Sequence, residues 1–225
     1  MPAILIATRN AHKVSEIQAI LGKPFEYLTL KDFPQAPKVI EDADTFAGNA
    51  TKKAVELAKW IAGHNAWPAA DFVLADDSGL EVDALNGAPG VFSARFAAMD
   101  SGENSPDADN NAKLLRLLKE VPLEKRTARF RCVIALTPVP SKAIESASPV
   151  CYADEPELQT QLFDGACEGR IIFEPRGANG FGYDPLFVPN GFDETFADLG
   201  EDIKNKLSHR ARALEKLKTT FDSQS

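Results

Sequence analysis

The short apolar run at residues 3–7, Ala-Ile-Leu-Ile-Ala, limits the folds open to this chain more than any other feature. The run has no polar position, so it predicts a strand covered on both faces rather than a half-exposed one. Strands of that kind occur in parallel or mixed sheets with helices packed against them. The run at residues 132–136 has the same character. We therefore expect an α/β fold built on a parallel or mixed sheet.

The residues after the first run predict a strand that leads into a helix through polar residues. Apolar positions recur at helical spacing in the order Val14, Ile17, Ile20, Leu21. Thr8 and Asn10 stand where helix-capping residues are expected, and capping is the commoner reason for such residues. Lys13 opposes the helix dipole unless an anion lies nearby. The alternative is therefore a phosphate bound at the helix N-terminus.

A second apolar run, at residues 72–74, ends in Ala-Asp-Asp-Ser-Gly. This pattern predicts a buried strand that delivers acidic side chains to the open edge of a sheet, where sites form in α/β proteins. On extended backbone Asp76 and Asp77 point to opposite faces, so only one of them is expected to face a site. An Asp-Ser-Gly turn between two strands is equally well supported, because Asp and Ser cap backbone groups and Gly takes positive φ.

The remaining segments complete an alternation of strands and helices. Strands are expected at residues 25–30, 126–136, 158–166, 169–173 and 186–188, and helices from Thr45 to Gly63, after Ser105, and in two pieces between Asp198 and Phe221. Residues 137–156 give no periodic signal and predict an extended surface loop or hairpin tip. The acidic residues before the long helix complement its dipole, although one of their carboxylates could instead reach a metal ion.

Two later segments offer groups that suit a nucleotide. The Gly-rich segment 174–185 contains Phe181 and Tyr183, whose rings could stack on a planar base or fold into the core. A predicted helix junction near the C-terminus collects four donors, Lys204, Lys206, His209 and Arg210. Such a cluster suits anions or base carbonyls, and a solvated charged face is the ordinary alternative.

Composition narrows the class of protein. The 225 residues are 44% hydrophobic and 26% charged, which is ordinary for one large globular domain over residues 1–225. A net charge of −8 argues against sequence-independent binding of nucleic acid, so an anionic substrate would need a local basic pocket or a metal ion. No apolar run approaches the roughly 20 residues that span a bilayer. Three widely spaced cysteines predict reduced thiols in a cytoplasmic protein.

Four motifs occur along the chain in one order: Thr-x-Asn-x-x-Lys from Thr8, Asp-Asp-Ser-Gly-Leu from Asp76 with a following Gly-Ala-Pro-Gly, Phe-Gly-Tyr-Asp-Pro from Phe181, and Ser-His-Arg from Ser208. Together, from Ile4 to about Leu217, they resemble the inosine triphosphate pyrophosphatase family, the noncanonical purine nucleoside triphosphate pyrophosphatases. The resemblance implies an α/β fold with a long, curved mixed β-sheet flanked by helices, and two lobes with a central cleft. It also implies a homodimer, a magnesium cofactor and a purine nucleoside triphosphate substrate.

The resemblance also implies which residues form the site. Asp77 corresponds to the catalytic base and metal ligand. The substrate-binding positions are Thr8, Arg9, Asn10, Ala11, His12, Lys13, Ser78, Phe181, Gly182, Tyr183, Asp184, Lys204, His209 and Arg210. The chain departs from the pattern at Arg9, where the family often has Gly, and at Gly48, where many members carry Glu. Gly48 leaves the second metal ligand to Glu41, with Asp76 as the other candidate.

The function implied is magnesium-dependent hydrolysis of ITP, dITP or XTP to the monophosphate and pyrophosphate, which removes these nucleotides from the pool. A 6-keto oxygen can accept hydrogen bonds from donors such as His209 or Arg210, whereas the 6-amino group of adenine would face them donor to donor. Two alternatives stay open. One is a pyrophosphatase for other modified nucleotides, and the other is a nucleotide-binding sensor of the same fold with weak or no catalysis, which Gly48 makes worth considering.

Overall fold

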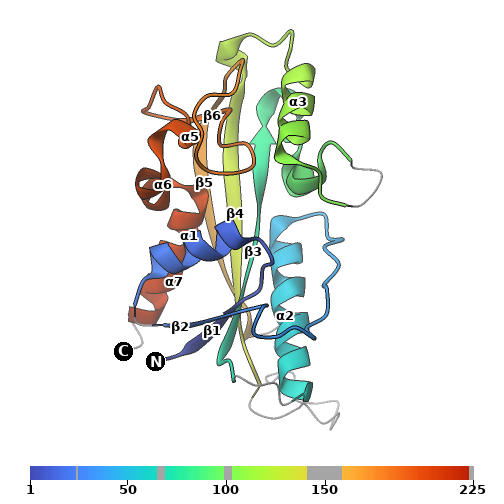
Figure 1. Ribbon diagram of the computed structural model, residues 1–225, viewed down its shortest axis with the longest axis vertical. Coiled ribbons are helices and arrows are strands. Elements are labelled where there is room, and N and C mark those ends of the chain that lie inside the picture. The colour runs from blue at the N-terminus through green and yellow to red at the C-terminus, as the bar shows by residue number, and fades with distance from the viewer. Residues whose placement is uncertain (24, 65–68, 99–102, 141–158, 223–225) are drawn as a thin grey trace. The chain divides into compact units, whose positions relative to one another are not determined.

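The computed structural model describes residues 1–23, 25–64, 69–98, 103–140 and 159–222. Within these residues one sheet has the strand order β2-β1-β3-β4-β5-β6 (Figure 1). Its strands are β1 (Ala3–Ile6), β2 (Glu26–Thr29), β3 (Phe72–Val82), β4 (Thr127–Pro138), β5 (Gln161–Ile171) and β6 (Phe187–Pro189). β1 pairs in parallel with β2 and β3, whereas β5 and β6 pair antiparallel. The prediction of a mixed sheet is confirmed.

Helices lie between these strands along the chain and follow the last of them (Figure 1). They are α1 (Ala11–Leu21), α2 (Phe46–His64), α3 (Asp107–Leu117), α5 (Phe196–Leu199), α6 (Glu201–Leu207) and α7 (His209–Asp222), with short 3₁₀ helices η1 (Asp83–Leu85), η2 (Gly90–Arg95) and η3 (Leu123–Lys125). α1 joins β1 to β2 and α2 joins β2 to β3, as parallel strands require a crossover connection. The predicted α/β class is confirmed.

The chain forms two compact units. Unit 1 contains Met1–Asp77, Val133–Phe163 and Leu214–Ser225, and unit 2 contains Ser78–Cys132 and Asp164–Ala213. The strands β3, β4 and β5 each contribute residues to both units. The single domain over residues 1–225 and the central cleft stay predictions.

Unit 1 is organised around β1, which lies between β2 and β3 in the sheet. The register places Leu5 opposite Leu28 of β2 and Val73 of β3. Ile4, Leu5 and Ile6 are fully buried. This burial is expected for a parallel strand that is covered on both faces.

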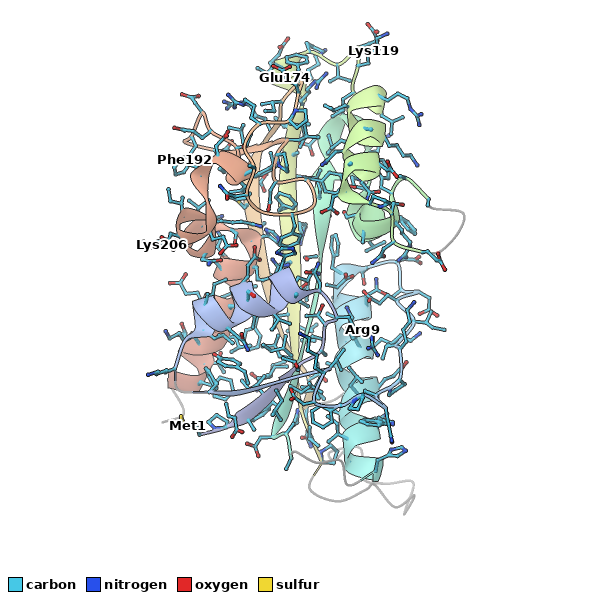
Figure 2. The ribbon with its side chains drawn as sticks, in the orientation of Figure 1. Met1, Arg9, Lys119, Glu174, Phe192 and Lys206 are labelled. Carbon is cyan, nitrogen blue, oxygen red and sulfur yellow. The ribbon has the colours of Figure 1, made fainter. Side chains whose placement is uncertain are left out.

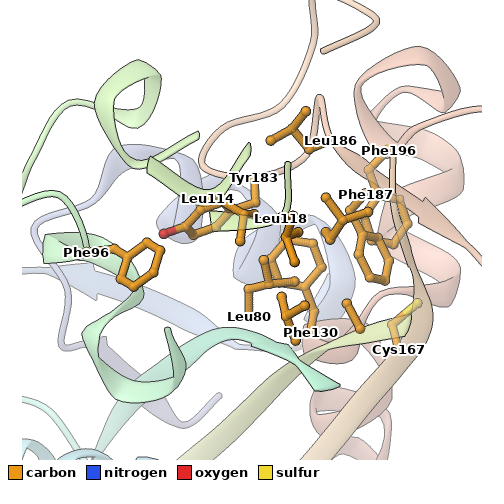
Figure 3. Close-up of a cluster of buried hydrophobic side chains, with 13 residues drawn as sticks. Leu80, Phe96, Leu114, Leu118, Phe130, Cys167, Tyr183, Leu186, Phe187 and Phe196 are labelled. Atoms are coloured by element: carbon orange, nitrogen blue, oxygen red, sulfur yellow. The ribbon is translucent and has the colours of Figure 1, made fainter. Parts of the chain in front are cut away.

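A cluster of apolar side chains forms the core of unit 2 (Figure 3). Three phenylalanine rings meet in it, with centroid distances of 4.7 Å between Phe130 and Phe187 and 5.3 Å between Phe187 and Phe196. Tyr183 of the Gly-rich segment is buried in the same cluster. Large aromatic rings contribute strongly to the stability of a core, so this segment is anchored on unit 2 at Tyr183.

Two strands are more continuous than the sequence predicts. β3 runs without a break from Phe72 to Val82, so the alternative of an Asp-Ser-Gly turn is wrong. β5 runs from Gln161 to Ile171, so the predicted pair of strands in this region is also wrong. A Cβ at Gly165 would lie 2.1 Å from the carbonyl oxygen of His209. Gly165 therefore permits the close approach of α7 within a continuous strand.

The C-terminal segment contains three helices, α5, α6 and α7, rather than the predicted two pieces. Ser208 Oγ accepts a hydrogen bond from the Ala211 N–H at 3.2 Å, so the predicted cap of the last helix is confirmed. The predicted loop at 137–156 begins inside β4, and its residues from 141 onward lie outside the described residues. No helix in the described part of the chain is long and apolar enough to cross a membrane.

Candidate active site

The polar residues of unit 1 gather where β1 ends beside β3. The chain leaves β1 through α1 to reach β2 on one side, and it later returns through α2 to β3 on the other side. The Ala7 N–H donates to the Leu74 carbonyl at 2.8 Å, so the end of β1 lies beside Leu74, near the start of β3 and just before Asp76 and Asp77. Open α/β sheets bind ligands at such switch points, beyond the carboxyl ends of the strands.

Lys13 and Asp76 form a buried ion pair at this point. The Lys13 ammonium contacts Asp76 Oδ1, and Asp76 is 1% exposed. Asn10 Oδ1 accepts from the N–H groups of His12 and Lys13 at 2.9 and 3.2 Å, and Thr8 Oγ1 accepts from the Asn10 N–H at 3.2 Å. The capping alternative is thus confirmed for Thr8 and Asn10. Asp76 supplies the anion that offsets Lys13 in the first turn of α1.

Asp77 contacts a different helix from Asp76, as the alternation of side chains along a strand predicts. Asn49 Nδ2 of α2 donates to Asp77 Oδ2 at 3.0 Å. Burial raises the pKa of Asp77 from 3.8 to about 6, because it disfavours the charged carboxylate. The charges of Lys13 and Lys53 oppose this rise in the pKa, and the charge of Glu41 adds to it. A carboxyl group that titrates near neutral pH has the property required of a general base.

Lys53 of α2 contacts both β3 and the acidic loop that precedes α2. Its Nζ donates to the Asp76 carbonyl at 3.0 Å and pairs with Glu41 Oε2, also at 3.0 Å. Lys53 is 9% exposed, and the Glu41 side chain is 37% exposed. In unit 1 Lys13 thus pairs with the Asp76 carboxylate and Lys53 with the Glu41 carboxylate, which is open to solvent.

Two of these carboxylates suit a magnesium ion. Among the described residues, no group of three or more His, Cys, Asp or Glu side chains is placed to hold a metal ion. Magnesium usually binds proteins through only one or two carboxylates, with waters and substrate phosphates as its other ligands. Asp77 and Glu41 lie close enough for the charge of Glu41 to act on Asp77, and the Glu41 side chain is open to solvent, whereas the Asp76 side chain is fully buried. Asp77 and Glu41 therefore fit such an ion better than Asp76 does.

The raised pKa of Asp77 predicts an effect on stability in metal-free buffer. Above pH 6 the folded protein holds a buried charge that the unfolded chain solvates, so the ionised carboxylate costs about 3 kcal/mol of unfolding free energy. Asp77→Asn should therefore raise the unfolding free energy at pH 8, and the gain should shrink below pH 6 and vanish near pH 4. Urea unfolding in the presence of EDTA measures the gain in unfolding free energy at each pH. An equal gain at pH 8 and pH 4 would show that the gain does not arise from the buried ionised carboxylate.

The other predicted phosphate-binding residues lie at the start of α1. Arg9 lies on the surface between β1 and α1 (Figure 2), where its guanidinium donates to the Ala36 carbonyl at 3.4 Å. Ala11 and His12 are the first two residues of α1, and both are exposed. The Arg9 guanidinium is thus engaged by the loop that precedes α2.

In unit 2 a buried ion pair holds the Gly-rich segment. Lys204 Nζ of α6 lies 2.6 Å from Asp184 Oδ2, with side-chain exposures of 3% and 1%. The same Asp184 oxygen accepts from the Phe181 N–H at 2.9 Å, and the Lys204 ammonium lies 4.3 Å from the centroid of the Phe181 ring. The predicted residues Phe181, Asp184 and Lys204 are therefore brought together.

Tyr183 differs from Phe181 in its surroundings. Its ring is 4% exposed in the core, and its hydroxyl donates to the Ser93 carbonyl at 2.9 Å. The prediction that Tyr183 could stack on a base is corrected on this ground, because both faces of a core ring are covered by protein. Phe181 is half-buried, so in this segment it remains the candidate for stacking on a base. Gly182 stands between them with φ at +63°, in the left-handed region that favours glycine.

Ser78, His209 and Arg210 also lie in unit 2. Arg210 Nη2 donates to Ser78 Oγ at 2.9 Å, and Arg210 is 1% exposed. The His209 ring stacks on Phe130, with centroids 4.8 Å apart and planes 14° apart. These contacts hold both α7 residues in fixed orientations. The alternative of a solvated charged face is therefore wrong for Lys204, His209 and Arg210, whereas Lys206 is exposed.

Asn49 and Lys53 belong to the site but were not predicted from the sequence. Both are buried on α2, and their spacing of four residues places them on one face of the helix. That face also carries the apolar residues that pack inward. An amide and an ammonium at inward positions of an otherwise apolar face are the signal that could have identified them, because buried polar groups need partners.

Comparison with known proteins finds relatives along nearly the whole chain. A sequence profile of the Ham1 family matches residues 4–220. The dITP/XTP pyrophosphatase of Shouchella clausii is 44% identical over 222 residues, which cover 99% of this chain and 98% of the relative. The dITP/XTP pyrophosphatase of Geobacter sulfurreducens is 48% identical over 219 residues, covering 97% and 96%. A solved structure of a HAM1 protein from Coxiella burnetii is 37% identical, with a TM-score of 0.78 and coverage of 99% of this chain and 100% of that one.

Proposed function

Since this chain belongs to the Ham1 family, we propose that it is a nucleoside triphosphate pyrophosphatase that hydrolyses ITP, dITP and XTP to the monophosphate and pyrophosphate. The names of its relatives support the substrate class. The single observation that carries the proposal is Asp77. It is a buried carboxylate near Lys13 and Lys53, and burial raises the pKa of Asp77 to about 6. Buried carboxyl groups perturbed in this way are typical of catalytic sites.

Asp77 acts in this proposal as the general base. With a pKa of about 6 it is mostly ionised at neutral pH, yet it is basic enough to accept a proton from water. The hydrogen bond from Asn49 holds the carboxylate in one orientation. A water molecule bound to Asp77 would lose its proton as it attacks the phosphate chain, and the fixed geometry supplies much of the remaining acceleration.

The lysines of unit 1 would bind the phosphates. Lys13 and Lys53 bring two positive charges to a protein whose net charge is −8. Both already pair with carboxylates, so an incoming triphosphate would compete with Asp76 and Glu41 for them. Asp77 and Glu41 would hold a magnesium ion, which when bound neutralises phosphate charge and polarises the phosphoryl group.

The residues of unit 2 would bind the base. Phe181 offers a ring for stacking, which adds affinity for any purine. His209, Arg210 or nearby backbone N–H groups would donate to the 6-keto oxygen of hypoxanthine or xanthine. Adenine would leave such donors unpaired, which costs about 1–3 kcal/mol for each donor and corresponds to roughly tenfold to hundredfold rejection.

A panel of triphosphates tests reaction, base preference and cofactor together. Release of pyrophosphate from ITP, dITP and XTP should exceed release from ATP by about ten- to a hundredfold in kcat/KM, because adenine leaves donors unpaired. EDTA should abolish the release, and added magnesium should restore it. Equal kcat/KM for ATP and ITP would contradict the 6-keto argument, and faster turnover of a pyrimidine or methylated nucleotide would favour a pyrophosphatase of other modified nucleotides.

Gly48 favours one second candidate, a nucleotide-binding sensor with weak or no catalysis. A Cβ at this position would lie 2.8 Å from the Ala43 Cβ, so the backbone there has no room for the glutamate that many relatives are expected to carry. If Glu41 does not take the place of that glutamate, the chain would bind ITP without hydrolysing it. Binding of ITP without release of pyrophosphate in the same buffer would identify a sensor.

The proposal also includes a homodimer in the cytoplasm. Cys167 is a free and buried thiol in the described part of the chain, which suits a reducing compartment. The dimer rests on the family resemblance, and sedimentation equilibrium at micromolar concentration tests it. A molecular mass near 24.4 kDa would contradict the dimer.

A further inference from the structure

Two residues of α3 bind the peptide groups next to Phe181. The Gly182 N–H donates to Asp107 Oδ2 at 2.7 Å, and the Gly182 carbonyl accepts from Asn111 Nδ2 at 3.0 Å. Asp107 is the first residue of α3, and Asn111 lies four residues later, so both side chains leave the same face of the helix. One helix face therefore holds both backbone polar groups of Gly182.

The conformation of Gly182 decides how the Phe181 ring is aimed. Its φ of +63° turns the chain in a way that favours glycine, and a Cβ there would meet nothing within 4 Å. The backbone angle, and not lack of space, is thus what requires glycine. On one side of this turn Tyr183 is fixed in the core, and on the other Phe181 is half-buried. A rotation at Gly182 would therefore move Phe181 while Tyr183 stays in place.

We infer that Asp107 and Asn111 are positioning residues for the purine base: by binding Gly182 they fix the ring of Phe181 at the orientation on which a base stacks. The inference rests on the proposed function and adds two residues that lie outside the four sequence motifs. Stacking depends on the relative orientation of two planes, so a ring that is free to rotate binds a base less well. The hydrogen bond to a carboxylate is the stronger of the two, because its acceptor is charged.

Substitutions at Asp107 test the inference through the split between KM and kcat. Asp107→Ala should raise KM for ITP about three- to tenfold and leave kcat within about twofold, because it weakens binding and not the chemical step. Since stacking does not select among purines, KM for ATP should rise by the same factor. Asp107→Asn keeps an acceptor oxygen for the Gly182 N–H and should stay close to wild type. Asp109→Ala is the matched control, because it removes the same charge from the same turn of α3 and should change neither constant.

A double-mutant cycle with Phe181 separates positioning from a general structural effect. In a Phe181→Ala background, Asp107→Ala should raise KM by less than about twofold, because the ring to be positioned is gone. Asn111→Asp, which places a carboxylate against the Gly182 carbonyl, should raise KM only when Phe181 is present. The same rise in both backgrounds, or no rise in the wild-type background, would overturn the inference. Absence of ITP hydrolysis by the wild-type protein would instead overturn the proposed function, and the inference with it.

Discussion

Replacement of Asp77 by asparagine is expected to lower kcat for ITP by about 10²- to 10⁴-fold. Asparagine keeps the size of the side chain and can still accept the hydrogen bond from Asn49, but it cannot take a proton from water. At a magnesium concentration that saturates both proteins, the dissociation constant of ITP should change by less than about threefold, because the lost proton transfer belongs to the transition state. Single-turnover release of pyrophosphate measures the first quantity, and calorimetric titration measures the second.

Asp83→Asn is the matched control for this result. Asp83 follows β3 directly and is exposed. It pairs with Arg129 on the surface, and surface ion pairs contribute little to stability. The control should keep the kcat of wild type. Turnover by Asp77→Asn above a tenth of the wild-type rate would show that Asp77 is not the general base. A loss of ITP binding in parallel with the loss of turnover would assign Asp77 to binding alone.

Lys204→Met should strongly destabilise unit 2. Lys204 and Asp184 are almost fully buried, and methionine would leave the Asp184 carboxylate charged in the core without its cationic partner. Loss of one partner of a buried pair costs about 3–5 kcal/mol, which in a protein of this size lowers the thermal midpoint by about 6–20 °C. Thermal unfolding followed by circular dichroism measures the change.

Two further variants separate the charge effect from a loss of packing. Lys206→Met removes the same charge from the same helix at an exposed position and should change the midpoint by less than about 2 °C, because exposed charges contribute little. Asp184→Asn in combination with Lys204→Met removes both charges and should recover much of the lost stability. If the double variant is as unstable as Lys204→Met, the cost arises from packing and not from the unpaired carboxylate.

Most of the fold could be predicted because its signals are local. The apolar run at residues 3–7 identified β1, and the helical spacing after it identified α1, with Asn10 as its cap. The two errors in the strands have one cause. Asp-Ser-Gly in β3 has the composition of a turn, and a break was predicted between residues 166 and 169 of β5, yet both segments lie inside continuous strands. The requirement at Gly165 comes from α7, which is far away in the sequence and invisible to a local pattern.

The site was predicted less completely, because its residues act through partners that a sequence does not display. The motifs indicated the family, and that prediction is confirmed. They did not show that Asp76 would pair with Lys13, or that Tyr183 would enter the core while Phe181 stayed half-buried. Asn49 and Lys53 were missed because they lie in a helix whose apolar stripe masks them. Such polar residues become recognisable only when their burial is known.

The products formed from ITP test the central claim most directly. Wild-type protein with magnesium should convert ITP to IMP and pyrophosphate in equal amounts, and anion-exchange chromatography resolves these from IDP and phosphate. We predict that IMP and pyrophosphate appear together from the first turnover and that neither forms with Asp77→Asn on the same time scale. Formation of IDP and phosphate, or unchanged ITP after prolonged incubation with the wild-type protein, would contradict the account.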